Sequence, residues 1–208
     1  MDEIFKNVEA EKRERIINSA LEEFSKNGFE KASTNEIVKN ANISKGSLFH
    51  YFGNKQQLFD KLIEFVVELI NDSISNTINW EESDFFLRVK EVVLIKASMT
   101  NRYPYIYDFF TVIFEGKSIK EMKTIAGKQT GELSQKIYTH NIDFSLFKDG
   151  IDLTITMNII QWTFEKFSEE AWEKSKNQGV TLDMKGISEE SDAYINALRK
   201  AFYKKQVM

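Results

Sequence analysis

The chain has 208 residues, of which 42% are hydrophobic and 29% charged, and its formal net charge is −4. This length can bury a sizeable core and fits one or two domains. The absence of cysteine excludes disulfides, thiolate metal sites and a cysteine nucleophile. No apolar run approaches the roughly 18 residues that a membrane span needs. The first six residues include acidic ones and lack an apolar core, so a signal peptide is not expected and a cytoplasmic protein is.

The first predicted helix covers residues 9–27. Its apolar residues recur at helical spacing, at Ile17, Ala20, Leu21 and Phe24. Gly28 fits the position just past the end of a helix. Three basic residues stand near the start, at Lys12, Arg13 and Arg15. They either contact phosphate groups or form a solvated face with the glutamates between them, and the sequence leaves both readings open.

Residues 33–55 form the most informative stretch, because they read as two short helices joined by a tight turn. Thr34 is the predicted N-cap of the first helix, since its hydroxyl can accept from backbone N–H groups of the first turn. Asn42 tolerates the left-handed conformation that a sharp turn needs. Ser44 caps the second helix, in which Leu48 and Phe52 lie four residues apart and face one side. This is the layout of a helix-turn-helix, whose second helix lies in the major groove of DNA.

With these residues in view, the run from Arg15 to Leu62 resembles the N-terminal DNA-binding domain of TetR-type (tetracycline-repressor-like) transcriptional regulators. The densest match is Ile-Ser-Lys-Gly-Ser-Leu-Phe-His-Tyr-Phe at residues 43–52. The sequence departs from the family pattern at three positions: Phe49 replaces a tyrosine, Asn42 a turn glycine and Ser47 a common threonine. The resemblance implies an all-α fold, with an N-terminal three-helix DNA-binding domain and a larger C-terminal helical domain for ligand binding and dimerisation.

The resemblance and the exposed side of the second helix together predict the DNA contacts. These residues are Thr34, Ser44, Lys45, Gly46, Ser47, Phe49, His50, Tyr51 and Lys55. In the major groove Lys45 can donate to guanine and Ser47 can donate or accept, whereas Thr34 and Lys55 are placed to contact phosphate. The alternative is a helix-turn-helix used only for packing.

The charge of the chain is compatible with DNA binding but is not evidence for it. A net charge of −4 speaks against generic nucleic-acid binding. Residues 33–55, however, hold Lys39, Lys45 and Lys55 against Glu36, a local balance of 3 − 1 = +2. Phosphate contacts are local, so an acidic protein can still bind DNA through one positive face.

The remainder of the chain is helical in pattern, and the predicted division is a DNA-binding domain at residues 1–54 and a C-terminal domain at 55–208. A predicted helix at 55–76 links the two and could act as a rigid lever. Further helices are expected, among them 145–175 and 188–204, the last with Ser188 as its N-cap. These last two are the candidates for a two-fold interface between identical subunits, through the apolar stripe Ile151, Ile155, Ile159 and Trp162.

Aromatic residues cluster in the C-terminal part and predict a ligand pocket between helices. The proposed lining is Tyr103, Tyr107, Phe110, Phe114, Met157, Asn158, Gln161, Trp162 and Glu165. Such a lining suits a small apolar, aromatic or cationic effector, the last through cation–π attraction. The alternative is that these rings form the core and the subunit interface.

The sequence holds no catalytic or metal-binding constellation, because His50 and His140 lack partners at ligand spacing. We therefore expect no cofactor and no enzyme, but a homodimeric, ligand-responsive regulator, a repressor in most proteins that it resembles, that binds a palindromic DNA operator and no membrane. Two alternatives remain open. One is a helical small-molecule-binding or catalytic protein with no role on DNA. The other is a regulator with a degenerate pocket that responds to a protein partner or to nothing.

Overall fold

The computed structural model describes residues 5 and 8–205, with only the backbone of Ile119. Within them the chain is all-α, as expected, apart from one isolated antiparallel bridge between Phe147 and Tyr203. None of the helices in this described part is long and apolar enough to cross a membrane. The expectation that there is no signal peptide was based on the first six residues. Of these, residues 1–4 and 6 lie outside the described residues.

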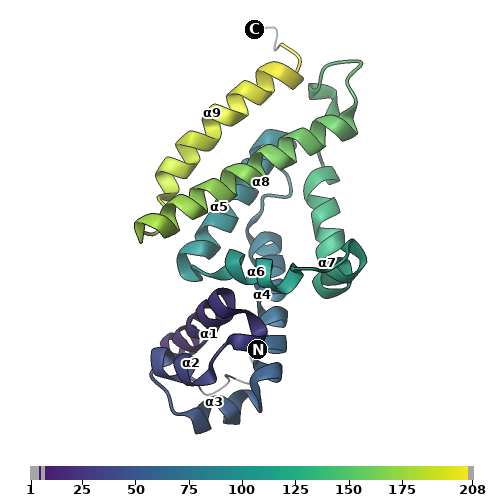
Figure 1. Cartoon of the computed structure of the whole chain (residues 1–208). Coiled ribbons are helices and arrows are strands. Elements are labelled where there is room, and N and C mark those ends of the chain that lie inside the picture. The colour runs from purple at the N-terminus through teal and green to yellow at the C-terminus, as the bar shows by residue number, and fades with distance from the viewer. Residues whose placement is uncertain (1–4, 6–7, 206–208) are drawn as a thin grey trace. The chain divides into compact units, whose positions relative to one another are not determined.

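The helices are shown in Figure 1. In chain order they are α1 Ala10–Lys31, α2 Thr34–Ala41, α3 Lys45–Phe52, α4 Lys55–Thr77, α5 Phe85–Arg102, α6 Ile106–Phe114, α7 Ile119–Thr139, a 3-10 turn at Phe144–Leu146, α8 Leu153–Gln178 and α9 Met184–Phe202.

Packing divides the chain into two compact units. Among the described residues, unit 1 comprises those up to Asn71 together with 103–130, and unit 2 comprises 72–102 and those from Gly131 onward. The two predicted domains, 1–54 and 55–208, are continuous stretches of the chain, whereas each packing unit combines two separate stretches. The predicted domain boundary therefore stays a prediction. The helix predicted at 55–76 is present as α4, which is uninterrupted from Lys55 to Thr77.

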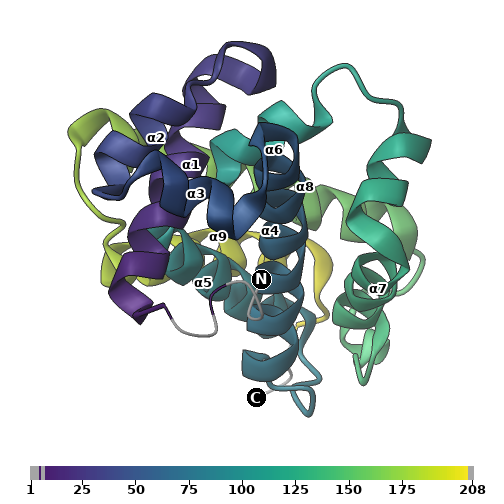
Figure 2. The same cartoon turned by 90° about the horizontal axis from the view of Figure 1, so that it is seen from below.

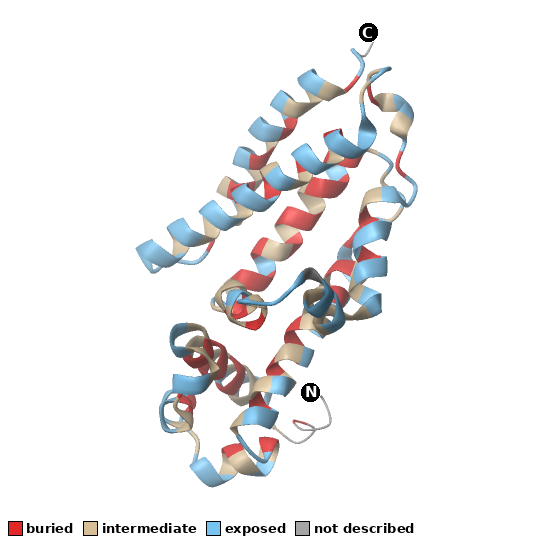
Figure 3. Ribbon diagram, turned by 45° about the vertical axis from the view of Figure 1, so that its right-hand side comes forward, coloured by how far each residue is buried: buried red, intermediate tan, exposed pale blue. Residues whose placement is uncertain are grey.

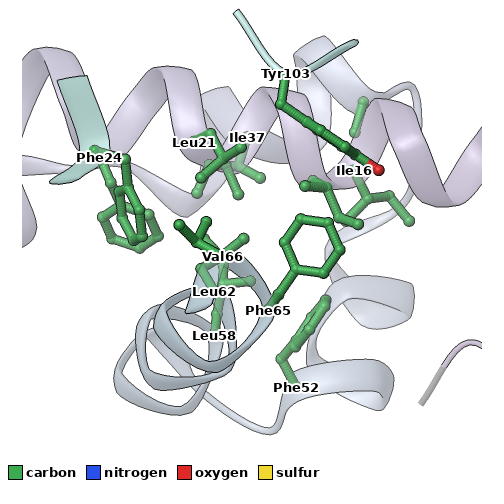
Figure 4. Close-up of a cluster of buried hydrophobic side chains, with 14 of the residues drawn as sticks. Ile16, Leu21, Phe24, Ile37, Phe52, Leu58, Leu62, Phe65, Val66 and Tyr103 are labelled. Carbon is green, nitrogen blue, oxygen red and sulfur yellow. The ribbon is translucent and has the colours of Figure 1, made fainter. Parts of the chain in front are cut away.

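The core of unit 1 forms where α1 packs against α2 and α6 and meets the inner faces of α3 and α4. Figure 4 shows its centre, with Phe24 and Leu21 of α1 facing Leu62 and Val66 of α4. The ring of Phe59 joins this cluster, with its centroid 4.9 Å from that of Phe24. Burying each of these large apolar side chains contributes roughly 1.5–3 kcal/mol, so the core fixes the position of α3.

Unit 2 is built around α5, which packs against α8 and α9. Its core holds Phe85 and Phe86 at the start of α5, and the ring of Tyr203 lies 4.9 Å from that of Phe86. The hydroxyl of Tyr203 accepts from the backbone N–H of Phe85 at 3.1 Å. Arg199 forms an ion pair with Asp84 at 2.6 Å. The start of α5 is therefore tied to the end of α9.

Several predicted helix ends were wrong because other residues supply the caps. Ser33, not Thr34, caps α2, since its hydroxyl oxygen accepts from the N–H of Glu36 at 3.4 Å. Asp152 starts α8, so this helix begins eight residues later than expected. Asp183 starts α9, so Ser188 lies inside that helix and caps nothing. Aspartate accepts from N–H groups as well as serine does, and Asp152 and Asp183 each accept from a backbone N–H at the start of their helix.

Candidate nucleic-acid interface

The turn between α2 and α3 is set by one left-handed residue. Asn42 has φ 54° and ψ 51°, as predicted, and its N–H bonds the carbonyls of the last turn of α2. The N–H of Ile43 donates to Val38 O at 3.0 Å. Asparagine adopts this conformation more easily than most residues. The chain can therefore reverse within two residues and start α3 at a fixed angle to α2.

The start of α3 is capped by a serine pair. Ser44 Oγ accepts from the N–H of Ser47 at 3.0 Å, and the two hydroxyl oxygens lie 2.8 Å apart. The cap satisfies a backbone donor that the first turn of a helix otherwise leaves open. It also fixes the side chain of Ser47 toward the N-terminus of α3, the end that reaches DNA first in a helix-turn-helix.

Burial separates the two sides of α3 as the sequence predicted. Leu48 and Phe52 are buried in the core of unit 1. Figure 2, which looks at the molecule from below, shows α3 between α2 and α4, with α1 behind it. The remaining residues of α3 keep solvent exposure: Lys45, Gly46 and His50 are exposed, and Ser47, Phe49 and Tyr51 are half-buried. The outer side of α3 is therefore free to meet a ligand as large as DNA.

The aromatic residues of α3 differ in what they touch. Lys45 Nζ lies 5.8 Å from the centroid of the Phe49 ring, a cation–π distance that holds the lysine close to the helix. The ring of Tyr51 packs 5.7 Å from that of Phe5. Tyr51 therefore serves partly in packing, whereas His50 is open to solvent.

Gly46 is not required by the fold. Its φ is not positive, and a Cβ atom built there meets only Ser44 Oγ, at 3.7 Å, an ordinary contact. Glycine weakens a helix relative to alanine by roughly 0.5–1 kcal/mol. A residue that costs stability and spares no clash is better explained by what approaches the helix from outside.

The two predicted flanking contacts, Thr34 and Lys55, lie at helix starts. Thr34 is the first residue of α2 and half-buried. Lys55 is the first residue of α4, and its Nζ donates to Glu30 O at 3.0 Å and lies 5.0 Å above the ring of Phe29. Lys55 thus ties α4 to the end of α1 and keeps its positive charge at the surface.

One positioning residue was missed by the sequence analysis. Glu23 is 9% exposed, and its carboxylate accepts from the N–H of Ser33 at 2.7 Å and from the amide of Asn27 at 3.0 Å. This buried carboxylate fixes the short connection between α1 and α2. The sequence pattern does indicate that Glu23 is buried, because Glu23 directly precedes the core residue Phe24 and shares the buried side of α1 with Ala20.

The predicted ligand-lining residues fall into both units. Tyr103 is buried in the core of unit 1, with its ring 5.3 Å from that of Phe65. Three more residues pack half-buried on the same core, namely Tyr107, Phe110 and Phe114. The other five belong to unit 2, namely Met157, Asn158, Gln161, Trp162 and Glu165. A pocket that joins the two groups stays a prediction.

Exposure distinguishes these five residues of α8 from one another. Met157 packs on the core of unit 2, whereas Asn158 and Glu165 are exposed and Trp162 is 63% exposed. The amide of Gln161 donates to Glu165 at 2.7 Å. A tryptophan so open to solvent fits a surface that another protein covers better than it fits a closed pocket.

The N-terminal region matches a known family. The sequence profile described as "Bacterial regulatory proteins, tetR family" matches residues 16–62. Among curated proteins, the nucleoid occlusion factor SlmA of Edwardsiella ictaluri is 28% identical over 99 residues, which are 47% of this chain and 50% of that protein. SlmA of Yersinia enterocolitica is 27% identical over the same extent. The chain thus spans about half the length of the curated relatives that it matches.

Solved structures share the fold over nearly the whole chain. A TetR family transcriptional regulator from Chloroflexus aurantiacus superposes with a TM-score of 0.67 and 19% identity, covering 98% of each chain. Another, from Marinobacter aquaeolei, has a TM-score of 0.61 and 14% identity and covers 94% of this chain and 97% of that one. At such identity the likeness concerns the fold.

Proposed function

We propose that the chain is a DNA-binding transcriptional regulator of the tetR family rather than an enzyme, that it binds a palindromic operator as a homodimer, and that it leaves the operator when a small molecule binds. The observation that supports operator binding is the two-sided character of α3. Its apolar side is locked in the core of unit 1, while Lys45, Gly46, Ser47 and His50 face outward.

In this proposal the outward residues make different kinds of contact with DNA. Lys45 and Ser47 read base edges in the major groove, and Gly46 allows the backbone to approach. Thr34, Ser44 and Lys55 hold the phosphate backbone on either side, which fixes register without reading sequence. Phe49, His50 and Tyr51 complete the surface through contacts to phosphates or to thymine methyl groups.

A second copy of the chain is proposed to cover an apolar face on α8 and α9. On α8, Ile155, Ile159 and Trp162 are 57%, 38% and 63% exposed and follow one another at helical spacing. On α9, Tyr194 is 39% exposed. The outward sides of these two helices are largely pale blue in Figure 3. Ile151, the fourth residue of the predicted stripe, lies before α8 and packs on the core of unit 2.

In the proposed dimer, the interface sets the distance between the α3 helices of the two subunits. Two copies of α3 about 34–36 Å apart can enter successive major grooves on one side of the duplex. An effector in the C-terminal domain that prefers another separation would weaken DNA binding, and DNA would weaken effector binding by the same free energy, typically about 1–3 kcal/mol. We expect α4 to transmit this change and the regulator to act as a repressor.

Selection of bound DNA from a random pool tests the proposal. We expect a palindrome whose half-sites are about one helical turn apart, because two identical helices related by a two-fold axis read the same bases. A single half-site, or no enriched sequence, contradicts the proposal.

A second function is a regulator that responds to a protein partner. It is favoured by the similarity to SlmA proteins, which are named nucleoid occlusion factors rather than ligand-responsive regulators. A thermal-shift screen against a small-molecule panel separates the two. Stabilisation by a compound that also releases the operator supports the effector proposal, and no stabilisation by any compound supports the protein partner.

A further inference from the structure

The start of α7 collects positive charge in a chain that is acidic as a whole. Residues 117–128, called here the α7 basic segment, contain four lysines and one glutamate, a balance of 4 − 1 = +3, whereas the whole chain has a net charge of −4. The lysines are Lys117, Lys120, Lys123 and Lys128, and all four are exposed. The segment belongs to unit 1. Neither the proposed DNA contacts nor the predicted ligand lining includes it.

Two of these lysines are not balanced by the fold. Several exposed lysines on other helices pair with a carboxylate one helical turn away, as in Lys26–Glu22, Lys39–Glu36, Lys61–Glu64, Lys166–Glu169 and Lys185–Glu189. Lys120 and Lys123 have no acidic residue three or four positions away in the sequence. Within the part of the chain that the structure describes, neither ammonium group has an ion pair or a hydrogen-bond acceptor.

The one acidic residue of the segment is already engaged at the start of α7. Glu121 accepts from the N–H of Ser118 at 2.8 Å and from its hydroxyl at 2.6 Å. This is the reciprocal arrangement that closes the first turn of a helix. Lys120 and Lys123 are neighbours on the helix surface, where like charges repel each other. The pair therefore costs stability, and the fold gives no return for it.

A kink places a third lysine at the same hollow. Gly127 has φ 79° and ψ 166° and interrupts α7, a conformation that glycine adopts more readily than other residues. Lys128 directly follows the kink. It lines an open hollow of about 650 Å³ together with Lys120, Lys123 and Thr124. Lysines from both sides of the kink thus face one space.

The α7 basic segment does not continue the proposed DNA surface. Figures 1 and 2 both show the start of α7 on the opposite side of α4 from α2 and α3. All of these parts belong to unit 1. The positive charge on α7 therefore serves a ligand other than the duplex that α3 is proposed to enter.

The lining of the hollow favours a compact anion with several charges. An ammonium group has three donors and no acceptor. Thr124 Oγ1 donates to Lys120 O at 2.9 Å, so the hydrogen of this hydroxyl is already used. The hollow thus presents cationic donors, which bind phosphate oxygens through strong, charge-assisted hydrogen bonds. Its volume lies within the range of about 300–1,000 Å³ that is typical of small-molecule sites, and it has room for more than one phosphate group.

We propose that Lys120, Lys123 and Lys128 bind a small anion with two or more linked phosphate groups, either a free phosphate chain or the phosphates of a nucleotide. The proposal goes beyond the proposed function, because the site uses neither α3 nor the predicted effector lining. It stands or fails without an operator.

Three probes test the ligand class by calorimetry with the full chain at low, fixed ionic strength. They are tripolyphosphate, ATP and hexa-aspartate. We expect tripolyphosphate to bind once per chain and hexa-aspartate to bind several-fold more weakly. Tighter binding of ATP than of tripolyphosphate assigns the site to a nucleotide, and equal binding assigns it to the phosphate chain. If hexa-aspartate binds as tightly as tripolyphosphate, or if tripolyphosphate does not bind, the proposal fails.

Four variants test the residues. We expect Lys120→Gln and Lys123→Gln each to weaken tripolyphosphate binding roughly threefold to tenfold, because each loses a charge-assisted hydrogen bond at an exposed position. Thr124→Val is a control that keeps the shape of the lining. Lys61→Gln is a control that removes an exposed lysine of unit 1 that pairs with Glu64. Both controls should bind as wild type does. If Lys61→Gln weakens binding as much as Lys123→Gln, general charge attraction explains the binding and the proposal fails.

Two further measurements separate the site from misfolding and from DNA binding. Lys123→Gln should melt no lower than wild type, because it removes the repulsion from Lys120. A DNA duplex added in excess should leave tripolyphosphate bound. If DNA displaces tripolyphosphate and Lys123→Gln also binds DNA less tightly, the α7 basic segment is a DNA contact and the proposal is overturned.

Discussion

Lys55 Nζ donates a hydrogen bond to the carbonyl oxygen of Glu30 at 3.0 Å and so joins the first residue of α4 to the last turn of α1. The same ammonium group lies 5.0 Å from the centroid of the Phe29 ring, and the Lys55 side chain stays partly exposed to solvent. One side chain therefore combines a structural bond inside unit 1 with the charge proposed to contact phosphate.

Lys55→Ala is expected to weaken binding to all DNA sequences alike. It should flatten the dependence of log affinity on log salt concentration by about 0.9, because one phosphate contact is lost. Loss of the bond to Glu30 should also lower the melting temperature. Lys55→Arg is the control that keeps the charge and a donor. Fluorescence anisotropy over a salt series measures the slope, and an unchanged slope removes Lys55 from the phosphate contacts.

Lys45→Ala is expected to act differently, by relaxing base preference. A lysine that donates to guanine contributes about 1–3 kcal/mol of discrimination between bases. The selected operator and versions with one half-site base changed should then bind the variant with similar affinity. Gel shifts on this set measure the effect. If Lys45→Ala and Lys55→Ala weaken every sequence equally, the proposed division between reading and positioning is wrong.

Gly46→Ala is expected to separate stability from DNA binding. The added methyl group meets no atom closer than 3.7 Å and should stabilise α3 by up to about 1 kcal/mol. In the proposed complex the same methyl group would separate α3 from the DNA, so operator affinity should fall. Gly131→Ala in α7, where a Cβ atom meets nothing within 4 Å, is the matched control. Unchanged affinity in Gly46→Ala would show that the backbone does not approach DNA there.

Trp162→Glu is expected to convert the dimer to a monomer. A charge placed in the centre of an apolar interface should raise the dissociation constant of the dimer on the order of a hundredfold. Leu87→Glu on α5 is the control, because Leu87 is also large, apolar and 44% exposed. Analytical ultracentrifugation measures the equilibrium. Operator affinity should fall with the dimer, and a Trp162→Glu variant that stays dimeric places the interface elsewhere.

Tyr138→Phe is expected to reduce the loss of stability in alkali. The pKa of Tyr138 is raised to about 12 in the folded chain, above its ordinary value near 10. Between these values the unfolded chain loses the proton first, so the free energy of unfolding falls as pH rises. Urea titrations from pH 9 to 12 should show a shallower fall for the variant. An equal fall would show that Tyr138 ionises normally in the folded protein.

The sequence was most informative where local pattern and packing agree. In α3 the apolar pair Leu48 and Phe52, the turn at Asn42 and the cap at Ser44 all indicated one structure, and the helix formed as predicted. The starts of α8 and α9 were misplaced because Asp152 and Asp183 compete as caps with residues nearby in the chain. Only the final packing decides which cap is used.

Long-range contacts account for what the sequence could not predict. Glu23 is distinguished from its neighbour Glu22 only by burial against the start of α2. Phe86 and Tyr203 stand at opposite ends of unit 2 in the sequence, and no spacing rule predicts that their ring centroids lie 4.9 Å apart.

Gly46 has a consequence for how the protein can diverge. Since the fold accepts a methyl group there, selection for stability alone would not preserve glycine. Under the proposed function, a mutant would be disfavoured only because it binds the operator less tightly. In the proposed complex, glycine at this position would be kept by the close approach of DNA to the backbone of α3. Its replacement in relatives should then accompany a changed fit between α3 and DNA and be independent of changes in the core.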